Sequence, residues 1–446
     1  MSTEQELEAI GRLNGGDSDV PSAMPKALAA LQWQVVTDVL EKHYTNPEIE
    51  AARILCAVLA SHALKDFLPA WCLAIAPPGS MKTDLLECFR GLPGVHFVDE
   101  VTTNTFLSGK VDDKRKKRTR PTSWLHRIGA DGVLVAADFS TFTSNPKTLQ
   151  IILAQLRRIY DGHFSREFGT DENVEERTWS GRLTFFGGAV PDIDGHYSLF
   201  QKLGERFIRV RWQRAGGVQT ALQAMEHTAQ IGEELRAAVH SLLHPLLSTP
   251  QMAPKVSNAI KRKIANLSEF VALARTYIER DGYNREATGV PVAEGNTRLP
   301  QQLCQVARGS ALLDGRLEVD EVDYKLLCRT ALDSLPPARI AILKAVLDAK
   351  SPFSVGLPKA TVDRAIEDLK LSGVLAEQSV LRETAKSLLV GAGLLLEAEE
   401  PSGSGESEVP ESTDRYRKEI SLTIPPISGT SGQPISSLLE FAPLED

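Results

Sequence analysis

The sequence predicts an α/β fold in which a mostly parallel sheet lies between two layers of helices. Short apolar runs, which are typical of buried strands, alternate with helical segments over residues 70–215. One of these runs, at 70–75, leads directly into a glycine-containing loop and then into a helix expected at 84–90. After residue 217 the apolar residues recur at helical spacing until about residue 335. This order predicts a three-layer core followed by a helical region.

The bulk composition is that of a globular protein. The chain has 446 residues, of which 42% are hydrophobic and 24% are charged, and its length predicts roughly two to four domains. The formal net charge of -8 shows no overall basic signature for nucleic acid. Residues 401–446 contain eight acidic and three basic residues and so carry a net charge of -5, which leaves a net charge of only -3 on the first 400 residues. A local basic patch on the body of the protein is compatible with this balance.

Cysteine usage and the N-terminal sequence predict a cytoplasmic protein. The five cysteines are widely spaced and form no C-x-x-C pair, so we expect buried thiols in a reducing compartment rather than a disulfide framework or a zinc site. Residues 1–17 are acidic and polar, unlike a secretory signal. The sequence has no apolar stretch of about 18 residues, so we expect no membrane span and no membrane partner.

The elements up to residue 216 are expected as follows. Residues 1–25 form a flexible lead-in, and 26–69 form a helical segment that is interrupted at Asn46–Pro47. The core is expected over 70–216. Besides the first strand, its loop and the helix after it, apolar patterns predict further strands, one more helix and a hairpin. They are strands at 95–99, 132–137, 183–187 and 206–212, a helix at 147–160, and a hairpin around 169–176.

Three units are expected beyond the core. Residues 217–336 form a helical region, or lid, with a loop at 282–295. Residues 337–398 suggest a winged-helix-like unit, because a helix at 358–371 is followed by what looks like the start of a β-wing at 374–375. The remaining 399–446 are acidic and rich in Ser, Gly and Pro, which predicts disorder.

The loop after the first strand carries the strongest chemical signal. A phosphate-binding loop needs successive backbone N–H groups aimed at the phosphates, a lysine to neutralise their charge, and a hydroxyl to bind Mg²⁺. Lys82 and Thr83 stand at those positions on the first turn of a helix, while Ala76 and Met81 replace two glycines of the usual pattern. The expected nucleotide-binding residues are Ala76, Pro77, Pro78, Gly79, Ser80, Met81, Lys82 and Thr83. The alternative is an ordinary strand-to-helix turn with a solvated lysine.

A second signal is Asp138, which ends an apolar run about 55 residues further on. A carboxylate at the end of a buried strand, expected here beside the phosphate strand, can hold Mg²⁺ together with Thr83. The next residue is Phe139 rather than the glutamate that often activates water, and Ser140, Thr141 and Thr143 offer only hydroxyls. The alternative role of Asp138 is to cap the strand. Because Phe139 cannot act as a base, we expect one of two outcomes. Either the protein hydrolyses ATP slowly, or a residue from elsewhere, such as Glu100, activates the attacking water.

A third signal is a dense basic segment. It has six bases in seven residues, and these are Lys114, Arg115, Lys116, Lys117, Arg118 and Arg120. Such density favours anionic partners, and neutralised phosphates would make binding of nucleic acid strongly salt-dependent. Trp124 follows and can either stack on a base or lie in the core. The hairpin region, with Arg166, Arg177 and Arg182, is a weaker second candidate.

The order of these segments resembles AAA+ ATPases, in particular minichromosome-maintenance-type helicases and replication ATPases of phages and plasmids. The segment 203–207, Leu-Gly-Glu-Arg-Phe, resembles the part of that branch that carries the arginine finger, and 297–303 resembles the start of its helical lid. The resemblance covers about 70–335. It implies that Arg206 reaches the γ-phosphate of a neighbouring subunit and that Arg298 acts as sensor 2. The chain departs from the pattern at Met81 and Phe139, and 187–191 has no Asn or Thr as sensor 1.

Together these signals predict an ATPase that acts on nucleic acid. The resemblance implies a ring or arc of subunits with ATP and Mg²⁺ at the interfaces and single-stranded or forked DNA as partner, as in a helicase or replication initiator of a mobile element. Lys82, Asp138, Arg206 and Arg298 are the expected catalytic residues. One alternative is a slow-hydrolysing, ATP-dependent switch or assembly protein. Another is a transcriptional regulator in which the phosphate loop has decayed.

Overall fold

The structure is a computed structural model that describes residues 26–108, 123–139, 145–170, 173–212, 216–226, 229–283 and 285–396. Its centre is a five-stranded sheet with the order β2-β3-β6-β1-β7. These strands are β1 (Trp71–Ile75), β2 (Val95–Phe97), β3 (Asp131–Ala136), β6 (Arg182–Ala189) and β7 (Phe207–Arg211). Every neighbouring pair is parallel, so all five carboxyl ends lie at one edge of the sheet. The predicted parallel α/β core is confirmed.

One expectation about this sheet is wrong. β3 does not lie beside β1, because β6 pairs with both of them and separates the two strands. The close approach of β3 and β6 depends on a glycine: a Cβ at Gly188 would lie 2.1 Å from the carbonyl oxygen of Ala137. The end of β3 therefore runs tightly along the end of β6, and this fixes where Asp138 emerges.

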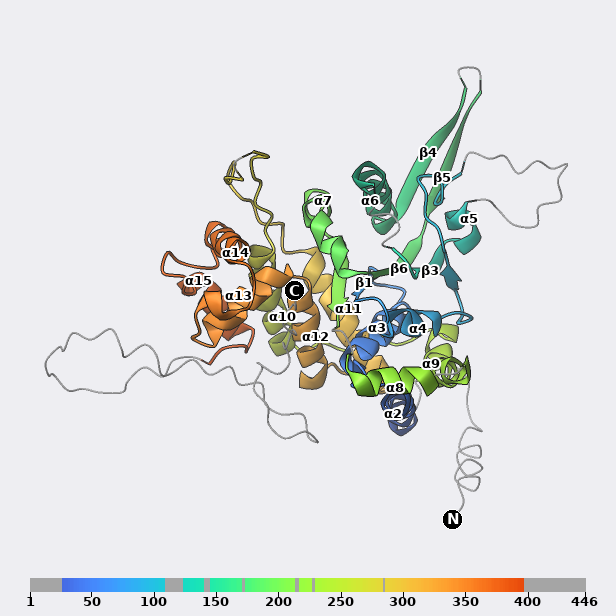
Figure 1. Cartoon of the computed structure of the whole chain (residues 1–446). Coiled ribbons are helices and arrows are strands. Elements are labelled where there is room, and N and C mark those ends of the chain that lie inside the picture. Colours follow the sequence, from blue (N-terminus) through green and yellow to red (C-terminus); the bar gives the residue numbers. More distant parts are fainter. Residues whose placement is uncertain are drawn as a thin grey trace, which may run out of the picture.

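Alternating residues of β1 face two separate apolar cores. Cys72 and Ala74 belong to the core that also contains α3 (Ile49–Ser61), whereas Trp71, Leu73 and Ile75 belong to the core that contains α6 (Pro146–Tyr160). We call these sides of the sheet the α3 face and the α6 face. Both are covered by helices, so the predicted three layers are present (Figure 1).

Some helices on the two faces are not predicted from the sequence, and another has different ends from those expected. The α6 face also carries α5 (Trp124–Ile128) and α7 (Tyr197–Lys202), neither of which is predicted from the sequence. The 3-10 helix η2 (Pro191–His196) precedes α7 and is likewise unexpected. On the α3 face, α4 (Lys82–Glu87) begins two residues before the expected start at 84 and ends before the expected end at 90.

A hairpin of β4 (His163–Thr170) and β5 (Asn173–Ser180) confirms the expected antiparallel pair. It projects from the α6 face beyond the rest of the core (Figure 1). Phe164 and Trp179 are buried at its base, and the Trp179 indole donates a hydrogen bond of 2.6 Å to the carbonyl of Gly129. The base is thus part of the α6-face core.

Most of the helical region after the core packs on the α3 face, although its first helix, α8 (Val218–Glu226), has no buried residue. The other members of the region are α9 (Ala229–Ser248), α10 (Asn258–Ala274), α11 (Arg298–Leu313) and α12 (Glu321–Asp333), and α2 (Lys26–His43) packs against α9. α11 lies so close to α3 that a Cβ at Gly309 would meet the carbonyl of Ala57 at 1.9 Å. Among the described residues, no helix is long and apolar enough to cross a membrane.

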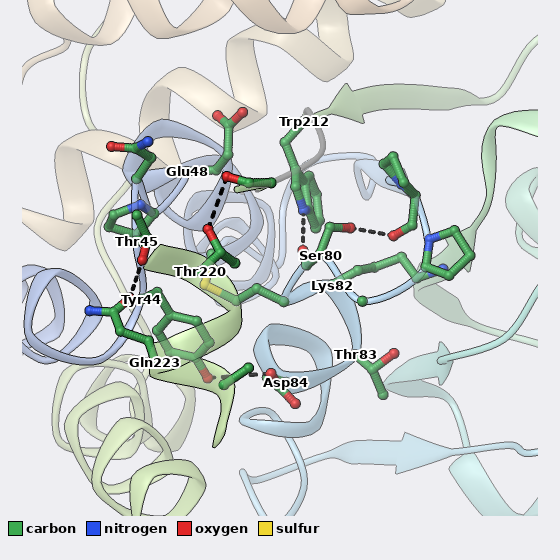
Figure 2. A pocket seen from close by; sticks show the side chains of 18 of the residues that line it. Tyr44, Thr45, Glu48, Ser80, Lys82, Thr83, Asp84, Trp212, Thr220 and Gln223 are labelled. Atoms are coloured by element: carbon green, nitrogen blue, oxygen red, sulfur yellow. Dashed lines mark hydrogen bonds between the residues drawn. The ribbon is translucent and has the colours of Figure 1, made fainter. Parts of the chain in front are cut away.

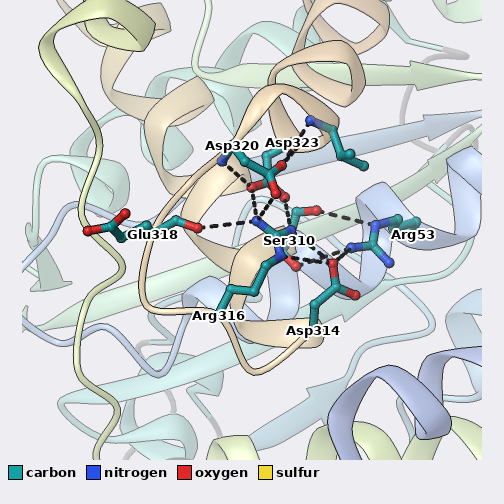
Figure 3. A network of polar contacts seen from close by, with 8 residues as sticks. Arg53, Ser310, Asp314, Arg316, Glu318, Asp320 and Asp323 are labelled. Carbon is teal, nitrogen blue, oxygen red and sulfur yellow. Dashed lines mark hydrogen bonds and ion pairs between the residues drawn. The ribbon is translucent and has the colours of Figure 1, made fainter. Parts of the chain in front are cut away.

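A polar network fixes α3 relative to the end of α11 and the start of α12 (Figure 3). Arg316 binds Asp323 through two contacts of 2.7 Å and Asp314 at 2.8 Å. Arg53 of α3 binds the same Asp314 at 2.7 Å. Because Asp323 is fully buried, the Arg316 guanidinium is needed to compensate its charge. The network therefore has a structural role.

The C-terminal unit is helical and docks on the rest of the chain. It contains α13 (Pro337–Leu347), η3 (Pro352–Ser354), α14 (Lys359–Leu371) and α15 (Glu383–Gly391). Where a wing is expected, the described residues form one bridged pair, Leu375 with Leu381, before α15 begins. Asp368 of α14 binds Arg280 at 2.6 Å and Arg339 at 3.0 Å. Ion pairs therefore tie this end of α14 to Arg280 and Arg339, and a winged helix stays a prediction.

Candidate nucleotide-binding site

The loop between β1 and α4 has the backbone geometry of an anion-binding turn. Gly79 has a φ of 74° and Met81 a φ of 61°, so two residues of the loop are left-handed. Alternation of left- and right-handed residues directs successive N–H groups into one concavity, which suits phosphate oxygens. The loop also precedes the positive end of the α4 dipole.

Two side-chain contacts hold this loop in place. The Ser80 hydroxyl donates to the carbonyl of Pro77, and the Trp212 indole donates to the carbonyl of Ser80 at 2.6 Å. Met81, which replaces a glycine of the usual pattern, packs its side chain against the α3-face core. The methionine is therefore accommodated by packing, although its left-handed backbone remains strained.

Lys82 lies on the floor of the site. Its side chain is buried, and its ammonium donates a hydrogen bond of 3.1 Å to the carbonyl of Ala189 at the end of β6. Burial lowers the pKa of Lys82, and the nearby charge of Asp138 opposes that shift. The structure thus brings the two central residues of the prediction together, although they lie about 55 residues apart in sequence.

Asp138 emerges directly after β3 and is exposed. The next residue, Phe139, donates its backbone N–H to the carbonyl of Gly188 at 2.6 Å. Its side chain is fully buried, with its ring 5.9 Å from that of Phe185 and 6.2 Å from that of Phe207. Residue 139 is therefore part of the α6-face core and offers no catalytic base. Ser140, Thr141 and Thr143 lie outside the described residues.

The loop opens into a cavity of about 850 Å³, which is within the usual size range of small-molecule sites. Lys82 and Thr83 line one part of it (Figure 2). Asp138 lines the cavity as well. The connection between α2 and α3 and one side of α8 line another part. The residues contributed by these two segments are His43, Tyr44, Thr45, Asn46, Pro47, Glu48, Thr220, Gln223 and Ala224.

Two further carboxylates of the cavity are held by ion pairing or hydrogen bonding. Glu48 binds Arg329 at 2.8 Å, and Asp84 accepts a hydrogen bond of 3.3 Å from the Tyr44 hydroxyl. Burial raises the pKa of Tyr44, so this hydroxyl stays protonated and remains a donor. A hydroxyl at Thr83 and a carboxylate at Asp138 are the hard oxygen donors that Mg²⁺ prefers, so the residues present fit that ion.

Arg206 and Arg298 do not line this cavity. Arg206 is buried, donates to the carbonyls of Leu203 at 2.9 Å and Gly204 at 2.7 Å, and lies 3.6 Å from Asp161. The guanidinium of Arg298 lies beside it around Gly204. Burial and the charge of Arg298 both lower the pKa of Arg206. The structure therefore pairs the two arginines but separates them from the phosphate loop of the same chain.

The basic segment, Lys114 to Arg120, lies outside the described residues, whereas the other suggested nucleic-acid residues are described. Arg166 donates to the carbonyl of Thr103 at 2.5 Å, and Arg177 donates to that of Ser108 at 2.9 Å. Arg182 begins β6, outside the hairpin, and donates to the carbonyls of Phe67, Leu64 and His62. These contacts hold the three arginines against the fold, and a role of the hairpin region in binding nucleic acid stays a prediction.

Trp124 contributes to the core, as one of its two expected alternatives predicts. Its side chain is partly buried and packs against the α6-face core. The guanidinium of Arg127 lies 4.8 Å from the centre of its ring. Stacking of this partly exposed indole on a base stays a prediction.

Sequence reasoning missed the part of the cavity that lies away from the phosphate loop. Trp212, Thr45 and Gln223 belong to no recognisable motif, and they come from three segments that only the folded chain brings together. The break at Asn46–Pro47 indicated a loop between helices, but nothing in the sequence placed it at the cavity.

The comparisons with known proteins assign no family to this chain. A scan against protein-family models finds no match, and a search of curated proteins finds none either. What the site does is therefore argued from its own geometry.

Proposed function

We propose that the protein binds ATP with Mg²⁺ in this cavity and uses it to act on nucleic acid. One observation carries the proposal: a loop with two left-handed residues, a buried lysine and an exposed carboxylate converge on one cavity at the carboxyl edge of a parallel sheet. This edge is where ligands of open α/β folds generally bind. An ordinary strand-to-helix turn with a solvated lysine does not account for the burial of Lys82.

The proposed roles follow from the chemistry of each group. The backbone N–H groups of 79–83 would bind the β- and γ-phosphates, and Lys82 would leave the carbonyl of Ala189 to neutralise them. Thr83 and Asp138 would hold Mg²⁺, which when bound neutralises charge that develops on the phosphates. Arg206 and Arg298 lie away from this cavity, so any role at a nucleotide would be at that of a neighbouring subunit. Arg298 is partly exposed, whereas Arg206 is buried and would have to leave the carbonyls of Leu203 and Gly204 to reach it.

The lack of a base at residue 139 favours slow hydrolysis. Among the described residues that line the cavity, Glu48 is paired with Arg329 and Asp84 accepts from Tyr44. Neither is placed as a ready base for an attacking water. Glu100 is exposed and is not among the lining residues. A second proposal is therefore an ATP-dependent switch or assembly protein whose nucleotide-bound state persists.

Action on nucleic acid is proposed from the sequence alone. Six bases between Lys114 and Arg120 would release counterions from bound phosphates. For single-stranded DNA the logarithm of the affinity should then fall with the logarithm of the salt concentration with a slope of about -4 if all six make contact. Replacing the six bases by serine should abolish most of that slope.

Steady-state ATP hydrolysis with and without single-stranded DNA separates these proposals. Stimulation by DNA that is lost in Lys82→Ala supports a motor. ATP binding without appreciable turnover supports the switch. DNA binding that is indifferent to both ATP and Lys82→Ala would contradict both and point to a DNA-binding protein with an inactive phosphate loop.

A further inference from the structure

The part of the cavity away from the phosphate loop has its own set of polar groups (Figure 2). Thr45, in the connection between α2 and α3, donates a hydrogen bond to the amide oxygen of Gln223 on α8. The Thr220 hydroxyl, one turn earlier on the same helix, instead donates to the carbonyl of Gly216 at 3.2 Å. Gln223 is therefore held in a defined position at the cavity wall. Its amide NH2 group can donate to a ligand while its oxygen accepts from Thr45.

This wall is formed by segments other than the phosphate loop. Since the loop would hold the β- and γ-phosphates, the base of an extended nucleotide must lie away from it. We propose that Gln223, positioned by Thr45, reads the base and makes the site selective for adenine over guanine. This inference rests on the proposed nucleotide site, and it adds the residue pair that would determine which nucleotide is accepted.

The selectivity follows from the donor and acceptor pattern of the two bases. A glutamine amide pairs through two hydrogen bonds with adenine, because it accepts from the N6 amino group and donates to N7. Guanine presents the O6 and N7 acceptors at the same edge. The amide oxygen would then face O6, and an acceptor opposite an acceptor forms no hydrogen bond. A preference for adenine of about tenfold or more is the usual consequence of such a pair.

The position of α8 makes the contact between Thr45 and Gln223 important. None of the nine residues of α8 is buried, so little apolar packing fixes the helix against the body. Val218, Leu222 and Met225 are 79%, 51% and 82% exposed, on the side of the helix away from Gln223. The polar contact at Gln223 therefore contributes to the placement of α8 over the cavity, and Thr45 is a positioning residue.

The test is the relative affinity for two nucleotides. ATP and GTP, each with Mg²⁺, would displace a fluorescent N-methylanthraniloyl-ATP from the full-length protein. The wild type should bind ATP at least about tenfold more tightly than GTP. Gln223→Ala should bring the two affinities within about twofold, mainly by weakening ATP. Thr45→Val should also lower the preference for ATP over GTP, but by less than Gln223→Ala does. The control Gln219→Ala, on an exposed part of the same helix outside the cavity, should leave the ratio unchanged.

A charge-bearing variant gives an independent check. Gln223→Glu removes the donor to N7, which both bases accept, and keeps an acceptor that only the N6 amino group of adenine satisfies, so both nucleotides should bind more weakly while ATP stays preferred. An unchanged thermal unfolding midpoint would show that each variant folds.

The possible outcomes distinguish the inference from the proposed function. If the wild type binds ATP and GTP equally, or if Gln223→Ala keeps the tenfold ratio, the inference is wrong while Lys82-dependent binding still supports the nucleotide site. If neither nucleotide binds the wild type, the proposed function and this inference are both overturned.

Discussion

At the scale of single residues, Met81 determines whether the proposed phosphate loop can adopt its shape. The residue holds a φ of 61°, which costs a non-glycine residue about 1–2 kcal/mol. A branched side chain at this position would be more strained still, because its Cβ carries two substituents. We expect Met81→Val to weaken ATP binding at least about tenfold, whereas Met81→Gly should retain it. Titration calorimetry of both variants checks this, and equal affinities would contradict the assigned backbone geometry.

His62 is the residue for which the structure predicts a pH dependence. It is buried, binds the Thr184 hydroxyl at 2.9 Å, and contacts Arg182 at 3.0 Å. Burial, followed by the charges of Arg182 and Lys65, lowers the pKa of His62 to about 3. The unfolded chain, with an ordinary histidine pKa of about 6.5, binds the proton more readily, so acid favours unfolding.

The free energy of unfolding should therefore be unaffected by this group above pH of about 6.5. Below that it should fall by about 1.4 kcal/mol per pH unit, until the folded state also takes up the proton near pH 3. Urea unfolding at several pH values checks this, with His62→Gln as the comparison that cancels the other titrating groups. Parallel pH profiles of the two proteins would show that His62 does not carry the effect.

The same scale shows what the sequence could reveal about the site. Lys82, Thr83 and Asp138 were identified because a phosphate loop and a strand-end carboxylate are local patterns. The pairing of Arg206 with Arg298 around Gly204 joins positions almost a hundred residues apart, so no local pattern could reveal it. No local pattern could reveal the hydrogen bond between Thr45 and Gln223 either, because these residues are also far apart in the sequence.

At the scale of elements, the contact between α3 and α11 leaves no room for a side chain at Gly309. A Cβ there would lie 1.9 Å from the backbone oxygen of Ala57, which cannot rotate away. Gly309→Ala should therefore lower the free energy of unfolding by about 1–3 kcal/mol. Thermal or urea unfolding measures the change.

A matched control for this substitution is available in α9. A Cβ at Gly232 would have no heavy atom within 4 Å, so Gly232→Ala should stabilise the protein by about 0.5–1 kcal/mol through helix propensity alone. Similar effects from the two alanines would show that α3 and α11 are not packed this closely.

Elements were predictable where the pattern is local and strong. The buried strands and α6 were expected within two residues of their ends, because their apolar periodicity is clear. The insertion of β6 between β1 and β3 was not, since hydrophobic runs do not encode which strand pairs with which. α5 and α7 are too short, at five and six residues, to show a helical period.

At the scale of the whole molecule, the separation of the two arginines from Lys82 predicts self-association. If Arg206 or Arg298 acts on the proposed nucleotide, it must do so from a neighbouring subunit, because neither lines the cavity of its own chain. We expect the mass from light scattering to rise to a multiple of 48.7 kDa with Mg²⁺ and a non-hydrolysable ATP analogue. Lys82→Ala should remain at its nucleotide-free mass. A strictly monomeric, nucleotide-bound wild type would contradict action in trans.

The most direct test of the account is the affinity of the purified protein for ATP with Mg²⁺, wild type beside Lys82→Ala. Lys147→Ala, which removes an exposed lysine outside the cavity, serves as the control. The account predicts binding by the wild type and the control, and a loss of at least about a hundredfold in Lys82→Ala, because a buried cation would no longer neutralise the phosphates. Equal affinity of wild type and Lys82→Ala, or no binding by the wild type, would contradict the assignment of this cavity as a nucleotide site.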